Sequence, residues 1–191
     1  IRRRCSESGA LLIFDEIQTG FFRTGKLFAY QHYGVVPDIL CLAKAMGGGM
    51  PMGAFVSSTE IFEVFKKNPP LNHVTTFGGH PVCCAAAHAN LETLLSSDFA
   101  EKAYRIAEMA CHMLRGEGIV EVRGRGAMLG LQLRDAELTR QVVEHCFEKG
   151  LILGWTLHSN SLIRIAPPLI IEPGLLEDSF EKILAAVRKF V

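Results

Sequence analysis

The sequence predicts an α/β fold in which two strands of a mainly parallel sheet carry the candidate chemistry. The runs Leu11–Asp15 and Ile39–Lys44 are apolar, have strand length, and each ends at one ionisable residue. Unbroken apolar runs of this kind are typical of strands buried on both faces of a parallel sheet. Ligands bind to such sheets beyond the carboxyl ends of the strands. Asp15 and Lys44 are therefore candidate site residues, and a salt bridge between them that caps both strands is the alternative.

Turn, cap and periodicity signals place the other elements of the first half. The elements predicted within residues 1–97 are a helix over 1–9, a strand over 10–15, a short helix over 28–33, strands over 39–44 and 51–57, and helices over 60–67 and 82–95. Ser58 or Thr59 can cap the helix over 60–67, because a hydroxyl accepts hydrogen bonds from first-turn N–H groups. The triplet Gly47–Gly49 lets the backbone pass close to a bulky group.

A break in the apolar pattern at Ser96–Asp98 predicts a domain boundary between residues 97 and 98. The remainder has the pattern of a smaller α/β unit. The elements predicted within residues 98–191 are a helix over 98–115, strands over 119–123 and 128–133, a helix over 136–149, strands over 151–155 and 162–166, and a helix over 173–190.

Composition excludes several classes of function. The net charge is zero, so the chain has no basic field for nucleic acid. No apolar stretch approaches the roughly 18 residues that a membrane-spanning helix needs. The mean hydropathy of +0.22 indicates apolar surface that another subunit or a further segment covers. The chain does not begin with Met, and we expect it to be the carboxy-terminal part of a longer protein.

The six cysteines include no Cys-x-x-Cys pair, and we expect no metal site among the cysteines and the seven histidines. The cysteines lie in apolar surroundings, which suits buried free thiols in a reducing compartment. We therefore expect a cytoplasmic protein without a metal site.

Hydroxyl groups and glycines precede the long helix predicted over 82–95. They lie in His73–Pro81, which contains Thr76. Hydroxyl groups and exposed N–H groups at the start of a helix suit a phosphate group. An ordinary N-cap loop is the alternative.

Several motifs occur in a fixed order and together resemble those of one enzyme family. These motifs are Asp15–Gly20, Leu42–Lys44 with Gly47–Gly49, Thr76–Gly79 and Arg164–Pro168. The set closely resembles the class III pyridoxal-phosphate-dependent aminotransferases, and most nearly their ornithine, acetylornithine and putrescine branch. The resemblance covers essentially the whole chain. It implies fold type I, with residues 1–97 as the carboxy-terminal part of the cofactor-binding large domain and residues 98–191 as the small carboxy-terminal domain.

Residue chemistry agrees with this resemblance at Lys44 and Asp15. Pyridoxal phosphate needs a primary amine to hold its aldehyde as a Schiff base, and Lys44 is the lysine at a strand end among glycines. Once released, Lys44 is the base that moves a proton between the substrate and cofactor carbons. Asp15 supplies the anion that keeps the ring nitrogen protonated, and burial beside a cation is expected to keep Asp15 ionised.

The resemblance implies roles for four further residues. Ile17 packs on a face of the cofactor ring, and Gln18 hydrogen-bonds the ring hydroxyl. Thr76 binds the cofactor phosphate of the neighbouring subunit, which implies a homodimer with shared active sites. Arg164 receives a substrate carboxylate, which a guanidinium can bind with two parallel hydrogen bonds. A structural arginine at a strand end is the alternative for Arg164.

The sequence departs from the family pattern in three respects. His80 stands where the family usually has Asn, at the start of a helix. Phe22 occupies a position near the pocket mouth that is often Gly in the family. The amino-terminal half, with the family's phosphate-binding loop and ring-stacking residue, is missing, so we expect these 191 residues alone not to transaminate.

The expected reaction moves the ω-amino group of ornithine, acetylornithine or a diamine such as putrescine to a 2-oxo acid such as 2-oxoglutarate. A decarboxylase or aminomutase of the same class is one alternative, because cofactor-binding residues do not fix which bond breaks. A truncated, non-catalytic chain is the other. Glutamate formation from an amine and 2-oxoglutarate by the full-length protein distinguishes an aminotransferase from a decarboxylase or aminomutase. Internal-aldimine absorbance of the isolated chain tests the non-catalytic alternative.

Overall fold

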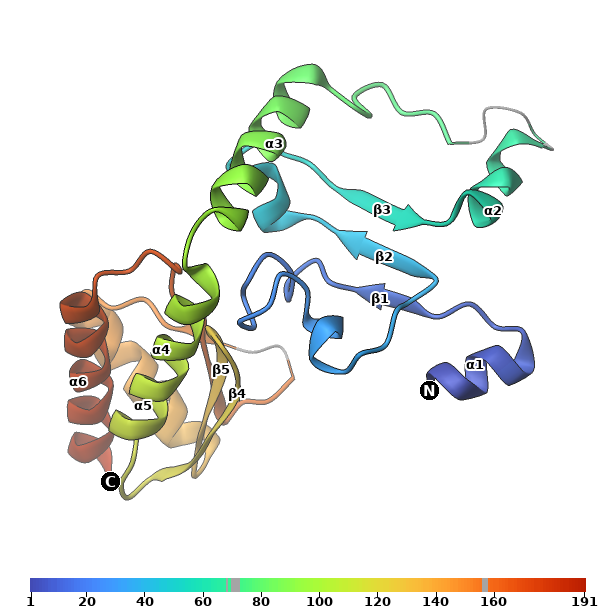
Figure 1. Ribbon diagram of the computed structural model, residues 1–191. Helices are drawn as coiled ribbons and strands as arrows, with labels where there is room; N and C mark the ends of the chain where they lie inside the picture. Colours follow the sequence, from blue (N-terminus) through green and yellow to red (C-terminus); the bar gives the residue numbers. More distant parts are fainter. Residues whose placement is uncertain (68, 70–72, 156–157) are drawn as a thin grey trace. The chain divides into compact units, whose positions relative to one another are not determined.

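The computed structural model divides the chain into two compact units (Figure 1). The parts of the chain that it describes are residues 1–67, 69, 73–155 and 158–191. The first unit comprises Ile1–Phe22 and Lys26–Asp98, and the second comprises Arg23–Gly25 and Phe99–Val191. The main division thus falls after residue 98, beside the position expected from sequence. Three residues of an earlier loop nevertheless belong to the second unit.

A three-stranded sheet in the order β1-β2-β3 organises the first unit. Its strands are β1 (Ile13–Asp15), β2 (Ile39–Leu42) and β3 (Ala54–Ser57), each shorter than its predicted run. β1 and β2 are parallel, whereas β3 runs antiparallel to β2, so this part of the sheet is mixed. Because β1 and β2 are parallel, their carboxyl ends lie at the same edge, where the sequence predicts the site.

The prediction that these strands are buried on both faces is wrong for the described chain. The strand register places Ile13 on one face of the sheet and Val56 on the other, because successive side chains alternate between faces. Ile13 is 56% exposed and Val56 is 52% exposed. Both faces therefore present apolar surface to solvent. The apolar strand sequences suit a sheet whose two faces are covered, and the described residues leave part of these faces uncovered.

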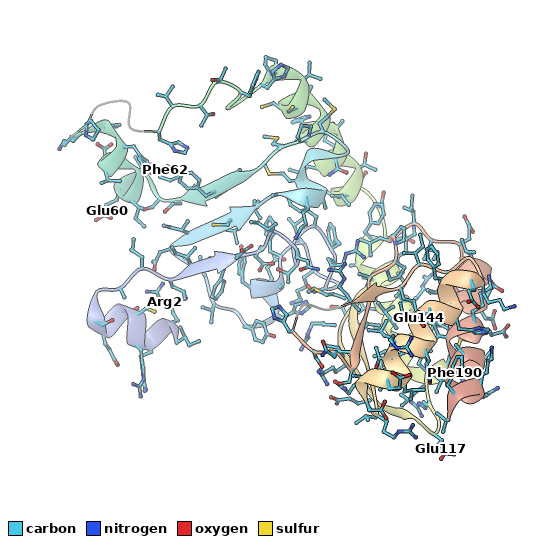
Figure 2. The ribbon with its side chains drawn as sticks, turned by 180° about the vertical axis from the view of Figure 1, so that it is seen from behind. Arg2, Glu60, Phe62, Glu117, Glu144 and Phe190 are labelled. Atoms are coloured by element: carbon cyan, nitrogen blue, oxygen red, sulfur yellow. The ribbon has the colours of Figure 1, made fainter. Side chains whose placement is uncertain are left out.

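Short helices and one long helix complete the first unit. They are α1 (Arg2–Ser8), η1 (Ala29–His32), η2 (Lys44–Gly47), α2 (Thr59–Phe62), η3 (Glu63–Lys66) and α3 (Pro81–Leu95). The helix predicted over 60–67 is therefore an α-helical turn followed by a 3₁₀ turn. Ser58 is its cap, because its hydroxyl accepts a hydrogen bond from the N–H of Ile61 at 3.3 Å. Phe62 of α2 (Figure 2) packs edge-to-face against Phe55 of β3, and the two ring centroids are 5.3 Å apart.

The second unit contains a four-stranded antiparallel sheet in the order β4-β5-β7-β6. Its strands are β4 (Ile119–Arg125), β5 (Met128–Leu133), β6 (Gly154–Trp155) and β7 (Leu162–Ile165). β4 continues two residues past the predicted end at 123, because Gly124 and Arg125 still pair with β5. β6 is shorter than the strand predicted over 151–155. The helices are α4 (Phe99–Met113), α5 (Ala136–Glu148) and α6 (Pro173–Phe190).

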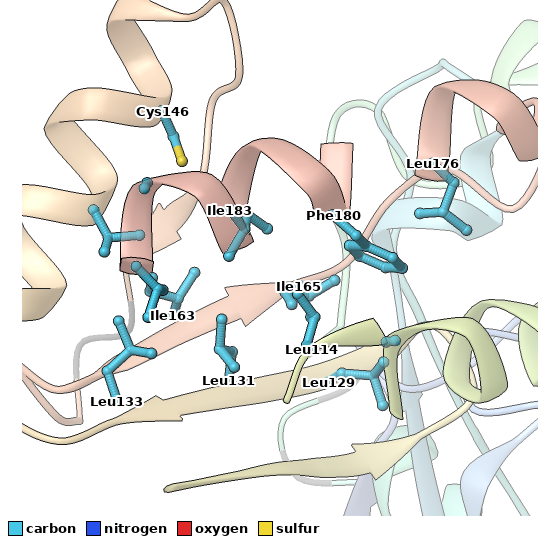
Figure 3. Close-up of a cluster of buried hydrophobic side chains, with 14 of the residues drawn as sticks. Leu114, Leu129, Leu131, Leu133, Cys146, Ile163, Ile165, Leu176, Phe180 and Ile183 are labelled. Atoms are coloured by element: carbon cyan, nitrogen blue, oxygen red, sulfur yellow. The ribbon is translucent and has the colours of Figure 1, made fainter. Parts of the chain in front are cut away.

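The core of the second unit forms where its helices pack on the sheet (Figure 3). Every second residue of β5 is buried, including Leu131, which has no exposed surface. Phe180 and Ile183 of α6 are each only 1% exposed and belong to the same cluster. Burial of each such side chain contributes roughly 1.5–3 kcal/mol to folding. The second unit therefore has a core of its own.

The segment Arg23–Gly25 is held tightly within the second unit. The guanidinium of Arg23 donates hydrogen bonds to the carbonyl oxygens of Pro167 (2.6 Å) and Ala127 (3.3 Å). The N–H of Ala127 donates back to the carbonyl of Arg23 at 2.9 Å. Burial lowers the pKa of the Arg23 guanidinium from its ordinary value. A Cβ atom on Gly25 would lie 2.5 Å from the ring of Tyr104, so only glycine fits there.

The six cysteines are free thiols. Cys83 and Cys146 are buried, as predicted, but Cys111 is exposed on α4. Burial raises the pKa of the Cys146 thiol to about 11, so this group stays protonated and unreactive near neutral pH. None of the described helices combines the length and apolar character needed to cross a membrane.

Candidate active site

Asp15 and Lys44 lie at the shared carboxyl edge of β1 and β2. Asp15 is the last residue of β1 and pairs with Cys41, and Lys44 follows the end of β2 by two residues. Both side chains are exposed, so the expected burial of Asp15 beside a cation is not found in the described chain. No ion pair joins them among the described residues, which removes the capping salt bridge as an explanation for their position. Both groups are open to a ligand.

The backbone of Lys44 is strained. Its φ of +48° lies in the left-handed region, which residues other than glycine rarely adopt. Such a conformation costs about 1–3 kcal/mol and persists only where the surrounding structure imposes it. Gly48 and Gly49 follow with φ of +57° and +98°, in the turn between β2 and the antiparallel strand β3. The turn thus presents Lys44 at the sheet edge at an energetic cost.

The loop after β1 is fixed by two neighbouring carboxylates. Oδ1 of Asp15 accepts a hydrogen bond from the N–H of Ile17 at 2.9 Å. Glu16 is only 3% exposed, and its carboxylate accepts from the N–H groups of Ala29 (2.9 Å) and Tyr30 (2.7 Å). The Thr19 hydroxyl also donates to Glu16. Between these anchors Ile17 is half-buried and Gln18 is exposed.

Sequence reasoning missed Glu16, although it stands beside Asp15 in the Asp-Glu-Ile-Gln motif. Its partners include backbone groups thirteen and fourteen residues away, which no local pattern reveals. The one local signal is the hydroxyl of Thr19, three residues later. Glu16 is therefore a structural residue that holds the loop carrying Gln18.

Glu16→Gln is expected to destabilise the first unit by about 1–3 kcal/mol, because an amide group in this buried site leaves a polar atom without a partner. Urea unfolding of this variant should show a lower midpoint than that of Glu7→Gln, which alters an exposed carboxylate on α1. Equal midpoints for the two variants would contradict the anchoring role.

Thr76 lies in an exposed turn before α3, together with Phe77, which is 79% exposed. Gly79 in this turn has φ of +69°. His80 stands at the N-cap of α3 but makes no side-chain cap hydrogen bond. The departure at His80 thus leaves the helix start without a side-chain cap, and the Thr76 hydroxyl is exposed to a ligand.

Phe22 also has a left-handed backbone, with φ of +64°. This conformation suits glycine, the residue that the resemblance leads one to expect at this position. Phe21 shares the strain, with φ of +57°, and its buried ring packs against Phe28 at a centroid distance of 5.7 Å. The loop is therefore held by its aromatic packing and by Glu16 despite unfavourable local geometry.

Arg164 belongs to the second unit, whereas the other candidate site residues belong to the first. It lies on β7 and is exposed. Arg164 lines a pocket of about 410 Å³ whose other walls are mainly apolar side chains of β7, α6 and the segment around β6. A Cβ atom on Gly154 would lie 3.2 Å from Nε of Arg164, so the strand approaches the guanidinium closely. A cation in such surroundings suits an anionic ligand.

Structural neighbours place the chain among the α/β aminotransferases. The family model of class-III aminotransferases matches residues 1–187. The chain therefore belongs to the class III aminotransferase family, as the motifs predicted.

Individual relatives agree with this assignment. A putrescine aminotransferase of Pectobacterium atrosepticum is 44% identical over 178 residues, which make up 90% of this chain and 38% of that protein. An ornithine aminotransferase from Toxoplasma gondii is 32% identical with a TM-score of 0.88, over 98% of this chain and 45% of that one. An acetylornithine aminotransferase from Elizabethkingia anophelis is 32% identical with a TM-score of 0.85, over 98% and 48%. The chain spans less than half the length of these relatives.

The exposed groups of the first unit fit the cofactor of this family. Class III aminotransferases depend on pyridoxal phosphate, and one structure of the Toxoplasma gondii enzyme is described with this cofactor at its active site. The sheet edge offers a primary amine on Lys44, a carboxylate on Asp15 and an amide on Gln18. A primary amine can react with an aldehyde, a carboxylate can accept a hydrogen bond from a protonated ring nitrogen, and an amide can hydrogen-bond a ring hydroxyl.

Proposed function

We propose that the protein transfers the ω-amino group of a diamine or an amino acid to a 2-oxo acid, with pyridoxal phosphate as cofactor. The observation that carries the proposal is Lys44, held in a strained turn at the same sheet edge as Asp15. The names of the relatives support putrescine, ornithine or acetylornithine as the donor class. 2-Oxoglutarate is the proposed acceptor. The free thiols fit a reducing compartment such as the cytoplasm.

Bound pyridoxal phosphate would supply an aldehyde that reacts with amines and a ring that takes up electrons. The Nζ of Lys44 would hold the aldehyde carbon and, once released, would move a proton at the reacting carbon as general base. Asp15 would hold a proton on the ring nitrogen, and Gln18 would hydrogen-bond the ring hydroxyl. Ile17 would pack against the ring face.

Thr76 would bind the phosphate of a second copy of the protein, so the proposed assembly is a homodimer with shared sites. Two features support this role for Thr76. Thr76 is exposed, and it lies before α3 in a turn in which Gly79 adopts a φ of +69°. The exposed apolar faces of the sheet are consistent with further covering by protein.

Arg164 would bind the carboxylate of the 2-oxo acid. Arg164→Lys keeps the positive charge but loses the two-pronged geometry. We expect the KM for the oxo acid to rise about ten- to hundredfold, the range that follows from losing a charge-assisted hydrogen bond. The KM for a diamine without a carboxylate should change little. Arg105→Lys, which alters an exposed arginine on α4, is the matched control. Equal losses for both substrates would make Arg164 a structural residue.

The proposed function is tested by incubating the full-length protein with putrescine, ornithine or acetylornithine and 2-oxoglutarate, and measuring glutamate. Release of carbon dioxide without glutamate would identify a decarboxylase, and an isomerised amino acid would identify an aminomutase. A protein that takes up no pyridoxal phosphate on any lysine would be a non-catalytic member of the family.

A further inference from the structure

The side chain of Asn90 on α3 contacts the turn that begins at Lys44. Its amide Nδ2 donates a hydrogen bond to the carbonyl oxygen of Ala45 at 2.7 Å. A longer contact of 3.5 Å reaches the carbonyl of Met46. Asn90 therefore holds the peptide group that joins Ala45 and Met46, one residue beyond Lys44, although it lies 45 residues after Ala45 in the chain.

Gly48 allows this contact. A Cβ atom on Gly48 would lie 2.8 Å from Cβ of Asn90 and 3.1 Å from the carbonyl oxygen of Ala86, both on α3. These distances are too short for a side chain. The helix and the turn thus approach each other as closely as a glycine permits, which brings the amide of Asn90 within hydrogen-bonding distance.

The strained backbone of Lys44 needs support on both sides. On its amino-terminal side, Leu42 is fixed by pairing with Ala54 of β3. The N–H of Met46 donates to the carbonyl of Ala43 at 3.0 Å and so spans Lys44. On its carboxy-terminal side, the carbonyl of Ala45 accepts a hydrogen bond from Nδ2 of Asn90 at 2.7 Å and a longer one from the N–H of Gly48 at 3.4 Å.

We propose that Asn90 is a positioning residue that maintains the left-handed turn of Lys44 and so directs the lysine amine to the sheet edge. The functional part of this inference rests on the proposed cofactor chemistry of Lys44. The anchoring part rests only on the contacts of the first unit. The two parts have separate measurements.

Helix propensity distinguishes an anchoring role of Asn90 from a role in stabilising the helix α3 itself. Alanine is a better helix former than asparagine, so Asn90→Ala favours α3 itself. Asn90→Asp keeps the size of the side chain but removes the donor and adds an acceptor facing two carbonyl oxygens. Thr93→Ala is the matched control, because it removes a side-chain hydrogen bond to a backbone carbonyl, that of Ala89, within the same helix.

The anchoring part is tested by amide hydrogen exchange in the protein without cofactor. Peptides covering residues 43–50 report the N–H groups of Met46 and Gly48, which bond within the turn. We expect exchange about tenfold faster in both Asn90 variants, because the turn opens more often. Thr93→Ala should match the unaltered protein. Unchanged exchange in the Asn90 variants would overturn the inference.

The functional part is tested on the same variants after loading with pyridoxal phosphate. We expect the rate of borohydride-trapped labelling of Lys44 to fall about tenfold or more, because small misplacements of a reacting group have large effects. The kcat should fall with it, while the KM for the 2-oxo acid stays within about twofold. Normal labelling and kcat in Asn90→Ala and Asn90→Asp would overturn the inference. Absence of a label on Lys44 in the unaltered protein would instead overturn the proposed function, and hydrogen exchange would still decide the anchoring role.

Discussion

Borohydride treatment of the full-length protein loaded with pyridoxal phosphate is expected to place a pyridoxyl label on Lys44. Lys44→Ala should lose this label and lower the transamination rate by about 10²- to 10⁴-fold, the range typical for loss of a positioned acid–base group. The reason is that Lys44 combines an exposed amine with a backbone forced into the left-handed region at the edge of the sheet. Peptide mapping by mass spectrometry locates the label.

Lys66→Ala is the control for this experiment, because Lys66 is an exposed lysine of the same unit that pairs only with nearby Glu63 in the described structure. Its label pattern and rate should equal those of the unaltered protein. A pyridoxyl group found on another lysine would refute the assignment of Lys44.

Asp15→Asn is expected to slow the chemical step by about 10²- to 10³-fold, as for loss of one preorganised electrostatic contact. The substitution removes the negative charge of the side chain but keeps its size and shape. An asparagine Oδ1 can still accept the hydrogen bond from the N–H of Ile17, so the loop should keep its shape. What is lost is the negative charge that would stabilise a proton on the cofactor ring.

Single-turnover measurements on the loaded protein separate this chemical step from cofactor binding. Cofactor uptake should remain, and the rate of the spectral change on adding amine should fall. Asp178→Asn, which removes an exposed carboxylate from α6, controls for the change in net charge. A rate near that of the unaltered protein would make Asp15 a purely structural partner of Ile17.

The positions of Asp15 and Lys44 could be predicted because they depend on local order along the chain. An apolar run sets each strand, and the first ionisable residue after it falls at the strand end whatever else surrounds the sheet. The parallel pairing of β1 and β2 then brings the two ends to one edge. The long helices of the second unit were predictable for a similar reason, since their apolar periodicity is clear.

The supporting contacts could not be predicted, because each joins residues distant in sequence. The buried carboxylate of Glu16 and the amide of Asn90 resemble ordinary polar residues until the fold brings backbone groups to them. The exposure of Ile13 was missed for the opposite reason. An apolar strand sequence indicates that its faces are covered, but does not say by which part of a protein or by which copy.

The insertion of Arg23–Gly25 into the second unit has a consequence for exchanging parts between relatives. A polypeptide that begins at Phe99 would leave the carbonyl of Pro167 without the guanidinium of Arg23 and the ring of Tyr104 without the glycine beneath it. The second unit is thus not a transferable module bounded by one cut. A chimaera with a related enzyme has to take Arg23–Gly25 and Phe99–Val191 from the same parent. A single crossover at residue 98 would combine these two segments of the second unit from different parents.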